Sequence, residues 1–152
     1  MRMTDELEEF LFALEPGWFR RDDQINSMMS DGFACGDGWF FLVLKIINRA
    51  KEEQERWHSA KQAAVFENVG DWCKQMLNQY PENPWDPGRF EIVQVKSKMG
   101  SLRVYYTGGT AGFRHYVDAI EEISAHVDEH TCQLRNVLKP GSSLDPKRAG
   151  LV

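Results

Sequence analysis

The sequence predicts an α+β fold, in which a helix-rich single domain contains a small antiparallel sheet. The clearest observation is the segment from residue 90 to residue 107, where apolar and polar side chains alternate on both sides of Met99-Gly100, as in a β-hairpin. The second is that apolar residues recur at helical spacing before and after this segment. The third is a C-terminal amphipathic stripe that predicts a helix against the hairpin.

The first element expected is a helix that begins near Thr4, a residue suited to the N-cap position, and ends at Pro16-Gly17. Residues 17–36 lack a sustained period and are interpreted as a connector. The apolar positions of this helix are Leu7, Phe10, Leu11 and Leu14, and the connector is anchored by Trp18, Phe19 and Phe33.

Asp37 is placed to cap a second helix whose opening, GWFFLVLKII, is apolar on nearly all sides and is therefore expected to be buried at the centre of the core. The charged continuation RAKEEQER suits a solvated face. A third helical pattern runs up to Pro81, and it predicts one buried face formed by Val69, Trp72, Cys73, Met76, Leu77 and Tyr80.

After the hairpin, the segment GGTAG at 108–112 is expected to be a strand-to-helix turn with Thr110 as the helix cap. The same turn is a weak candidate for phosphate binding, since it matches no established phosphate loop. The helix that follows carries the stripe Phe113, Tyr116, Val117, Ile120, Ile123 and Val127. We expect one globular domain over 1–135, and a mobile tail over the polar, turn-rich residues 136–152.

The composition limits the function classes. A chain of 152 residues with 42% hydrophobic residues is long enough to bury one core, and its net charge of −5 argues against a generic nucleic-acid binder. Three widely spaced cysteines favour a reducing compartment, and no apolar run approaches the ~20 residues that span a membrane. The expectation is a cytoplasmic protein without a membrane partner or a cofactor.

The register of the hairpin follows from keeping its apolar residues on one face. A loop centred on Met99-Gly100 sets Lys96 directly opposite Arg103 on the other face, whereas a three-residue loop would mix the two faces. Two like charges across a strand pair are destabilising, so an anionic group is expected nearby. The other predicted pairs are Val93 with Tyr106, Val95 with Val104, Ser97 with Leu102, and Gln94 with Tyr105.

Two sources of that negative charge stay open. One is an internal carboxylate, with Asp37 as the candidate because the acids of the last helix are expected to point away from the cations. The other is an external phosphate, carboxylate or acidic partner surface. Single-stranded nucleic acid would need stacking on Tyr105 as well as charge, and the net acidity argues against it. The candidate binding residues are therefore Gln94, Lys96, Lys98, Arg103, Tyr105 and Asp37.

Three segments together resemble a known family. CGDGW at 35–39, QVKSKMGSLRVYYTGG at 94–109 and a helix that ends in SAHVDEHTC at 124–132 are similar to motifs of small uncharacterised proteins encoded by bacteriophages and prophages. The resemblance covers roughly residues 5–134 and implies a phage-encoded protein in the bacterial cytoplasm, but no established activity. Many relatives continue with further cysteines that imply a zinc knuckle, whereas here Cys132 is followed by no second cysteine.

Candidate metal and catalytic groups are incomplete. His126, His130 and Cys132 are weak candidates for metal ligands, because two histidines four apart on a helix can share a metal. Ordinary surface residues near a helix C-terminus are the favoured interpretation, since histidines there also suit the helix dipole. Cys35 has no basic residue within three positions that would activate its thiol. No catalytic constellation is recognisable, so an enzyme is the less favoured class.

Three functional hypotheses follow. The leading one is a non-enzymatic, phage-encoded accessory protein that binds a host or phage protein and interferes with a host defence system. The second is a protein or enzyme that binds a small anionic ligand on the basic hairpin face. The third is a structural oligomer that pairs through an edge of the sheet. The surroundings of Lys96 and Arg103 are the observation that best separates them.

Overall fold

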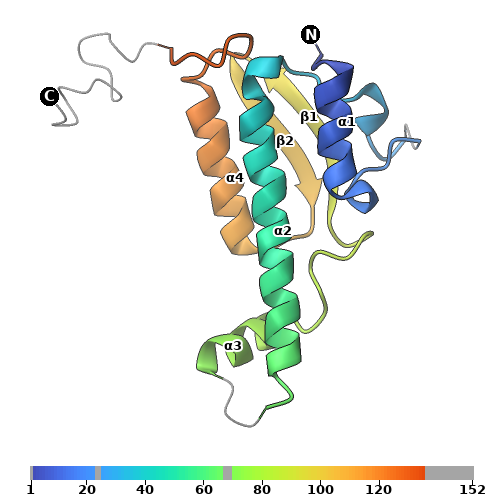
Figure 1. Cartoon of the computed structure of the whole chain (residues 1–152), viewed down its shortest axis with the longest axis vertical. Coiled ribbons are helices and arrows are strands. Elements are labelled where there is room, and N and C mark those ends of the chain that lie inside the picture. Colours follow the sequence, from blue (N-terminus) through green and yellow to red (C-terminus); the bar gives the residue numbers. More distant parts are fainter. Residues whose placement is uncertain (1, 23–24, 67–69, 136–152) are drawn as a thin grey trace, which may run out of the picture.

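The computed structural model describes residues 2–22, 25–66 and 70–135. It confirms the α+β class, with helices on a two-stranded antiparallel sheet (Figure 1). The expected C-terminal tail, residues 136–152, lies outside the described residues. The elements are α1 (Asp5–Leu14), α2 (Phe40–Ala63), α3 (Asp71–Gln79), β1 (Glu91–Lys98), β2 (Ser101–Thr107) and α4 (Ala111–Ser124).

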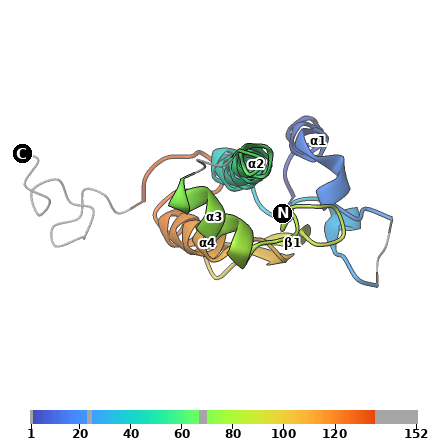
Figure 2. The same cartoon turned by 90° about the horizontal axis from the view of Figure 1, so that it is seen from below.

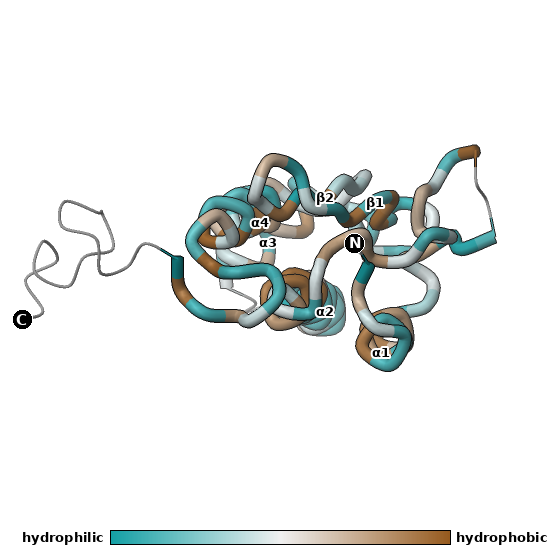
Figure 3. Tube along the Cα trace, turned by 90° about the horizontal axis from the view of Figure 1, so that it is seen from above, coloured by the Kyte–Doolittle hydropathy of each residue, from teal (hydrophilic) through white to brown (hydrophobic). Residues whose placement is uncertain are grey.

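The hairpin forms one layer and the helices α1 and α2 form a second layer over one of its faces, as the two end-on views agree (Figures 2 and 3). Helix α4 lies beside β2, and no described element covers the opposite face of the hairpin. The core lies between the two layers. The connector is anchored as predicted, since Trp18 and Phe33 are 0% exposed. The largest fully buried aromatic side chains are Trp18, Trp39, Trp85, Phe33, Phe90 and Phe113.

Helix α2 is the long central helix that the sequence predicts, but it is not buried on all sides. One stripe faces the core, whereas Phe41 on the opposite side is 61% exposed. The charged continuation is only partly solvated, because Glu52, Glu55 and Arg56 are exposed whereas the Arg49–Glu53 ion pair one turn apart is half-buried. The buried residues of α2 are Leu42, Val43, Ile46, Ile47, Ala50, Trp57 and Ala60.

The hairpin loop is centred on Met99-Gly100 as predicted, and it is a two-residue turn, because Met99 and Gly100 have φ angles of 52° and 82°, as a type I′ turn requires. One predicted pair is wrong. A bulge at Val93 brings Ile92 opposite Tyr106, and Ile92 is thereby buried in the core. The confirmed pairs are Gln94 with Tyr105, Val95 with Val104, Lys96 with Arg103, and Ser97 with Leu102.

The outer edge of β1 is occupied by the connector. The Met28 backbone N–H donates to the Val93 carbonyl (2.7 Å), and Ala34 exchanges hydrogen bonds with β1 through its own N–H and carbonyl. Ala34 N–H reaches the Val95 carbonyl and the Ala34 carbonyl accepts from Ser97 N–H, both at 2.9 Å. The groups that would pair with a strand of another molecule are already used.

The outer edge of β2 is capped by side chains of α4. Ser124 Oγ accepts from the Leu102 N–H (2.7 Å), and Glu121 Oε2 accepts from the Val104 N–H (2.9 Å). Both edges of the hairpin are thus protected within the chain, which disfavours an oligomer built by edge-to-edge strand pairing.

Helix α4 is shorter than predicted. It ends at Ser124, so Val127 lies beyond it, although its side chain is still buried. Ile123 was predicted to face the core but is 48% exposed, and Ser124 is buried in its place because it bonds to β2. The predicted cap is confirmed, since Thr110 Oγ1 accepts from the Phe113 N–H.

Helix α3 is the clearest departure from the predicted burial. Its apolar stripe was expected to form a buried face, yet none of its residues is buried and Trp72 is 58% exposed. Position 69 lies outside the described residues. The side chains of α3 remain exposed because this helix packs across the far end of α2, away from the core (Figure 1).

Candidate functional site

The CGDGW segment is a contact point for the loop that follows α4. A 3₁₀ turn over Asp37–Trp39 leads into α2, and the Gly38 N–H donates to the Glu129 carbonyl (2.6 Å). A Cβ atom at Gly38 would lie 2.4 Å from the Asp128 carbonyl oxygen, so only glycine permits this approach. The Trp39 Nε1–H donates to the Val127 carbonyl (2.8 Å). The motif therefore has a structural role in joining distant segments.

Glu129 connects this turn to the hairpin. Its carboxylate accepts from the Gly36 N–H (3.1 Å) and from the Ser97 hydroxyl (3.2 Å). All three segments that carry the family resemblance thus meet at one side chain. No local sequence pattern signals this contact, because the two partners of Glu129 are 93 and 32 residues away.

We call the place where the CGDGW turn, the hairpin and the loop after α4 meet the junction. Cys35 lies inside this junction and is not a nucleophile. Its side chain is 0% exposed, and burial, reinforced by the nearby charges of Glu129, Glu8 and Asp37, raises the pKa of the Cys35 thiol to about 12. A thiol that stays protonated at neutral pH has neither nucleophilic nor metal-binding reactivity. This agrees with the absence of an activating group in the sequence.

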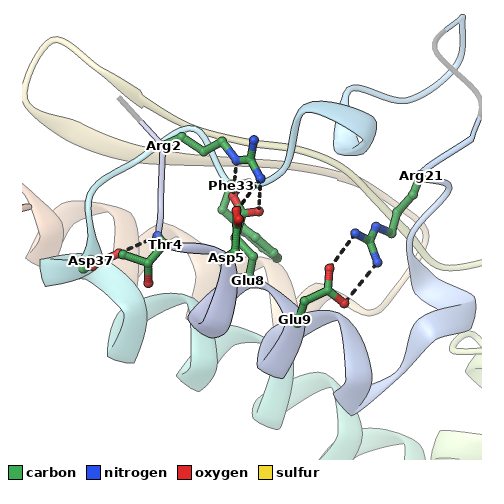
Figure 4. A network of polar contacts seen from close by, with 8 residues as sticks. All are labelled: Arg2, Thr4, Asp5, Glu8, Glu9, Arg21, Phe33 and Asp37. Atoms are coloured by element: carbon green, nitrogen blue, oxygen red, sulfur yellow. Dashed lines mark hydrogen bonds and ion pairs between the residues drawn. The ribbon is translucent and has the colours of Figure 1, made fainter.

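Asp37 does not have either of its predicted roles. It precedes α2 instead of capping it, and its Oδ1 accepts from the Thr4 N–H at the start of α1 (2.8 Å; Figure 4). No hydrogen bond or ion pair joins it to the hairpin cations within the described residues. Asp37 belongs to the network that fixes α1.

Glu8 is the buried acid of that same network. Its side chain accepts from the Phe33 N–H (3.0 Å) and pairs with Arg2, whose Nε lies 3.0 Å from Oε1 (Figure 4). Gly32 has a φ of +76° and approaches this carboxylate so closely that a Cβ would lie 2.3 Å from Oε1. The Glu8 carboxylate thus has its hydrogen-bond partners within the protein and is not available to a ligand.

The uncovered face of the hairpin carries the predicted binding residues. We call Gln94, Lys96, Lys98, Arg103 and Tyr105 the basic hairpin face. Lys96 lies opposite Arg103, and its Nζ is 5.7 Å from the centroid of the Tyr105 ring. Within residues 2–22, 25–66 and 70–135, no carboxylate lies within ion-pair distance of Lys96, Lys98 or Arg103. Among the residues that the structure describes, the internal ion pair that the sequence left open is therefore not formed.

The acids of α4 approach one side of this face, contrary to prediction. Because α4 lies beside the edge of β2, the Glu121 carboxylate is near Arg103 and is held by the Val104 N–H. Burial raises the pKa of Glu121, and the Val104 hydrogen bond and the Arg103 charge oppose that rise. Arg103 and Ser101 line a shallow groove whose other wall contains Asp118, Glu121 and Glu122.

The weak metal candidates are not assembled into a ligand set. Since α4 ends at Ser124, His126 and His130 do not share a helix face, and the His130 N–H donates to Asp128 Oδ1. His130 and Cys132 are exposed. In the described part of the chain, no three His, Cys, Asp or Glu side chains are grouped so that they could hold a metal ion.

Comparisons with known proteins add no family to these observations. No protein-family model matches the sequence, and neither a curated protein nor a solved structure is significantly similar to it. Among the described residues, no helix is both long enough and apolar enough to cross a membrane.

Proposed function

We propose that this chain is a non-enzymatic accessory protein that binds another protein through the basic hairpin face. The observation that carries the proposal is the pair Lys96 and Arg103, two like charges at directly opposed cross-strand positions without an ion-pair partner in the described chain. Such a pair weakens the free protein by a few tenths of a kcal/mol, up to about 1 kcal/mol. An acidic partner surface would relieve this repulsion on binding.

The surroundings of the face favour a protein partner over a small anion. The groove beside Arg103 carries three carboxylates, so a small anionic ligand placed there would be repelled, whereas a protein surface can contact Lys96 and Lys98 without entering the groove. The alternative of a small-molecule site on this face is therefore the weaker one. A nucleic acid would meet the same acids as it extended past β2, which agrees with the net charge of −5.

The biological setting of the proposal comes from the motif resemblance. A phage-encoded protein that acts in the bacterial cytoplasm, without catalysis, would bind a host or phage protein and interfere with a host defence system. Electrostatic complementarity suits such a role, since charged surfaces accelerate association with the correct partner and discriminate against others.

Affinity capture from bacterial lysate tests the proposal. We expect the wild-type chain to retain an acidic protein that is released as salt concentration rises, and we expect Lys96→Ala with Arg103→Ala to lose it. The matched control is Lys45→Ala with Lys74→Ala, which removes the same charge from exposed positions on α2 and α3. Retention of no protein above background, or equal retention by the hairpin variant, would refute the proposal.

A further inference from the structure

A second concave site lies at the other end of the molecule, where α3 crosses α2 near the start of α4. The cleft has a cavity volume of about 250 Å³. This is just below the roughly 300–1,000 Å³ of typical small-molecule sites, so the cleft suits a small ligand. Its walls come from the distal half of α2, from α3, from the segment at 84–85 and from the turn at 110–112. It is separate from the basic hairpin face and none of its lining residues belongs to that face.

Four of the twelve residues that line the cleft are aromatic. Three of the five tryptophans of the chain, Trp57, Trp72 and Trp85, line the cleft together with Tyr80. Trp57 and Trp85 are 7% and 1% exposed and form a fixed floor, whereas Trp72 on α3 is 58% exposed. Trp57 is also held in place, because its Nε1–H donates to the Tyr80 carbonyl (2.8 Å). A flat apolar ring placed in the cleft would cover part of the exposed Trp72 side chain on α3.

The polar groups of the cleft indicate the charge of its ligand. The Glu53 carboxylate is already engaged, since Oε2 lies 3.0 Å from Arg49 Nε and Oε1 accepts from Thr110 Oγ1 (2.6 Å). Arg56, one turn further along α2, has no ion-pair partner in the described part of the chain and its side chain is exposed. The unpaired charge at the cleft is therefore positive.

From these contacts we infer that the cleft binds a planar aromatic carboxylate, with the ring between Trp72 and the Trp57–Trp85 floor and the carboxylate at Arg56. Stacking on tryptophan supplies the affinity, and the guanidinium, which presents paired N–H donors to a carboxylate, supplies the selectivity. This site is independent of the proposed partner-binding face. A chain without any protein partner would still bind such a ligand here.

Calorimetric titration with three probes tests the inference. The probes are indole-3-acetate, indole and tryptamine, which share the indole ring system and are negative, neutral and positive at neutral pH. We expect indole-3-acetate to bind most tightly, about twofold to fivefold better than indole, because one exposed charge pair contributes up to about 1 kcal/mol. Arg56→Gln should abolish that difference while indole binding is kept. The charge control is Lys45→Gln, an exposed position on the same helix that does not line the cleft, and it should leave the difference intact.

The aromatic wall is tested separately. Trp72→Ala should weaken all three probes by about fivefold to tenfold, whereas Phe66→Ala, an equally exposed aromatic outside the cleft, should not. Arg56→Gln changes only an exposed side chain, so the selectivity test stands even if Trp72→Ala loosens α3. The inference is overturned if no probe shows saturable binding, if tryptamine binds best, or if the Arg56 and Lys45 variants behave alike.

Discussion

Lys96 and Arg103 lie directly opposite each other across β1 and β2, and neither has a carboxylate within ion-pair distance in the described chain. The surrounding fold could have neutralised them, because Glu121 is close by, but its carboxylate is fixed by the Val104 N–H. Natural folds depart from local rules mainly where a site requires it. The proposed partner-binding face is based on this unneutralised pair.

Gly38→Ala is expected to be severely destabilising. The new Cβ would lie 2.4 Å from the Asp128 carbonyl oxygen and 2.6 Å from the Glu129 carbonyl carbon, so the loop after α4 must move away from the CGDGW turn. We expect a loss of about 2–3 kcal/mol in unfolding free energy, measured by urea denaturation. Gly112→Ala is the matched control, because its nearest neighbour is 4.0 Å away and alanine favours helix. Equal stability of the two variants would mean that the junction is not tightly packed.

Glu121 is expected to stabilise the fold as an edge cap and not as a charge. Glu121→Ala removes the acceptor of the half-buried Val104 N–H and should cost about 1–2 kcal/mol. Glu121→Gln keeps an oxygen acceptor and should stay within about 0.5 kcal/mol of the wild type. Chemical denaturation of both variants at neutral pH measures this. If Glu121→Gln is as unstable as Glu121→Ala, the loss of stability is due to the missing charge and not to the missing hydrogen-bond acceptor.

The raised pKa of Glu121 predicts a pH dependence with a definite sign. The folded protein holds this proton more tightly than the unfolded chain, so the contribution of Glu121 to stability is largest at low pH and declines as pH rises above the ordinary value of 4.5 through the raised pKa. Relative to Glu121→Gln, the wild type should therefore lose stability over this window. Thermal unfolding at a series of pH values measures the difference, with Glu122→Gln as the control for removing one charge. A gain in relative stability with rising pH would contradict the assigned cause.

The cysteines are expected to differ strongly in reactivity. With a pKa of about 12, only about one Cys35 thiol in ten thousand is ionised at pH 8, and the side chain is inaccessible. Labelling with Ellman's reagent, followed by mass mapping, should modify the exposed Cys132 in the native protein and Cys35 only after unfolding. Comparable labelling rates at the two positions would show that the junction around Cys35 opens readily.

The sequence predicted the parts of this fold that depend on local periodicity. The hairpin register followed from the two-residue side-chain period and from the glycine at the turn, and four of its pairs are confirmed. The bulge at Val93 was missed; there the Val93 carbonyl accepts a hydrogen bond from the Met28 N–H of the connector. Sequence periodicity carries no signal of such a contact.

The parts of the candidate site that the sequence did not predict depend on contacts between distant segments. Asp37 was assigned to a helix cap because it precedes an apolar run, yet its partner is Thr4, 33 residues earlier. Glu121 was expected to face away from the hairpin, since α4 was placed over the apolar face and not beside the edge of β2. The basic face itself was predictable, because strand alternation decides which residues share a face.

Charge reversal at Lys96 tests the central claim most directly, and it needs no knowledge of the partner. Lys96→Glu replaces the repulsion with Arg103 by an attractive cross-strand pair, so we expect the unfolding free energy to rise by about 0.5–1 kcal/mol at low salt and the gain to shrink as salt is added. Lys98→Glu makes the same change in net charge opposite Ser101 and should give a smaller effect. If Lys96→Glu is instead less stable than the wild type, Lys96 is neutralised within the fold and the hairpin face has no need of an acidic partner.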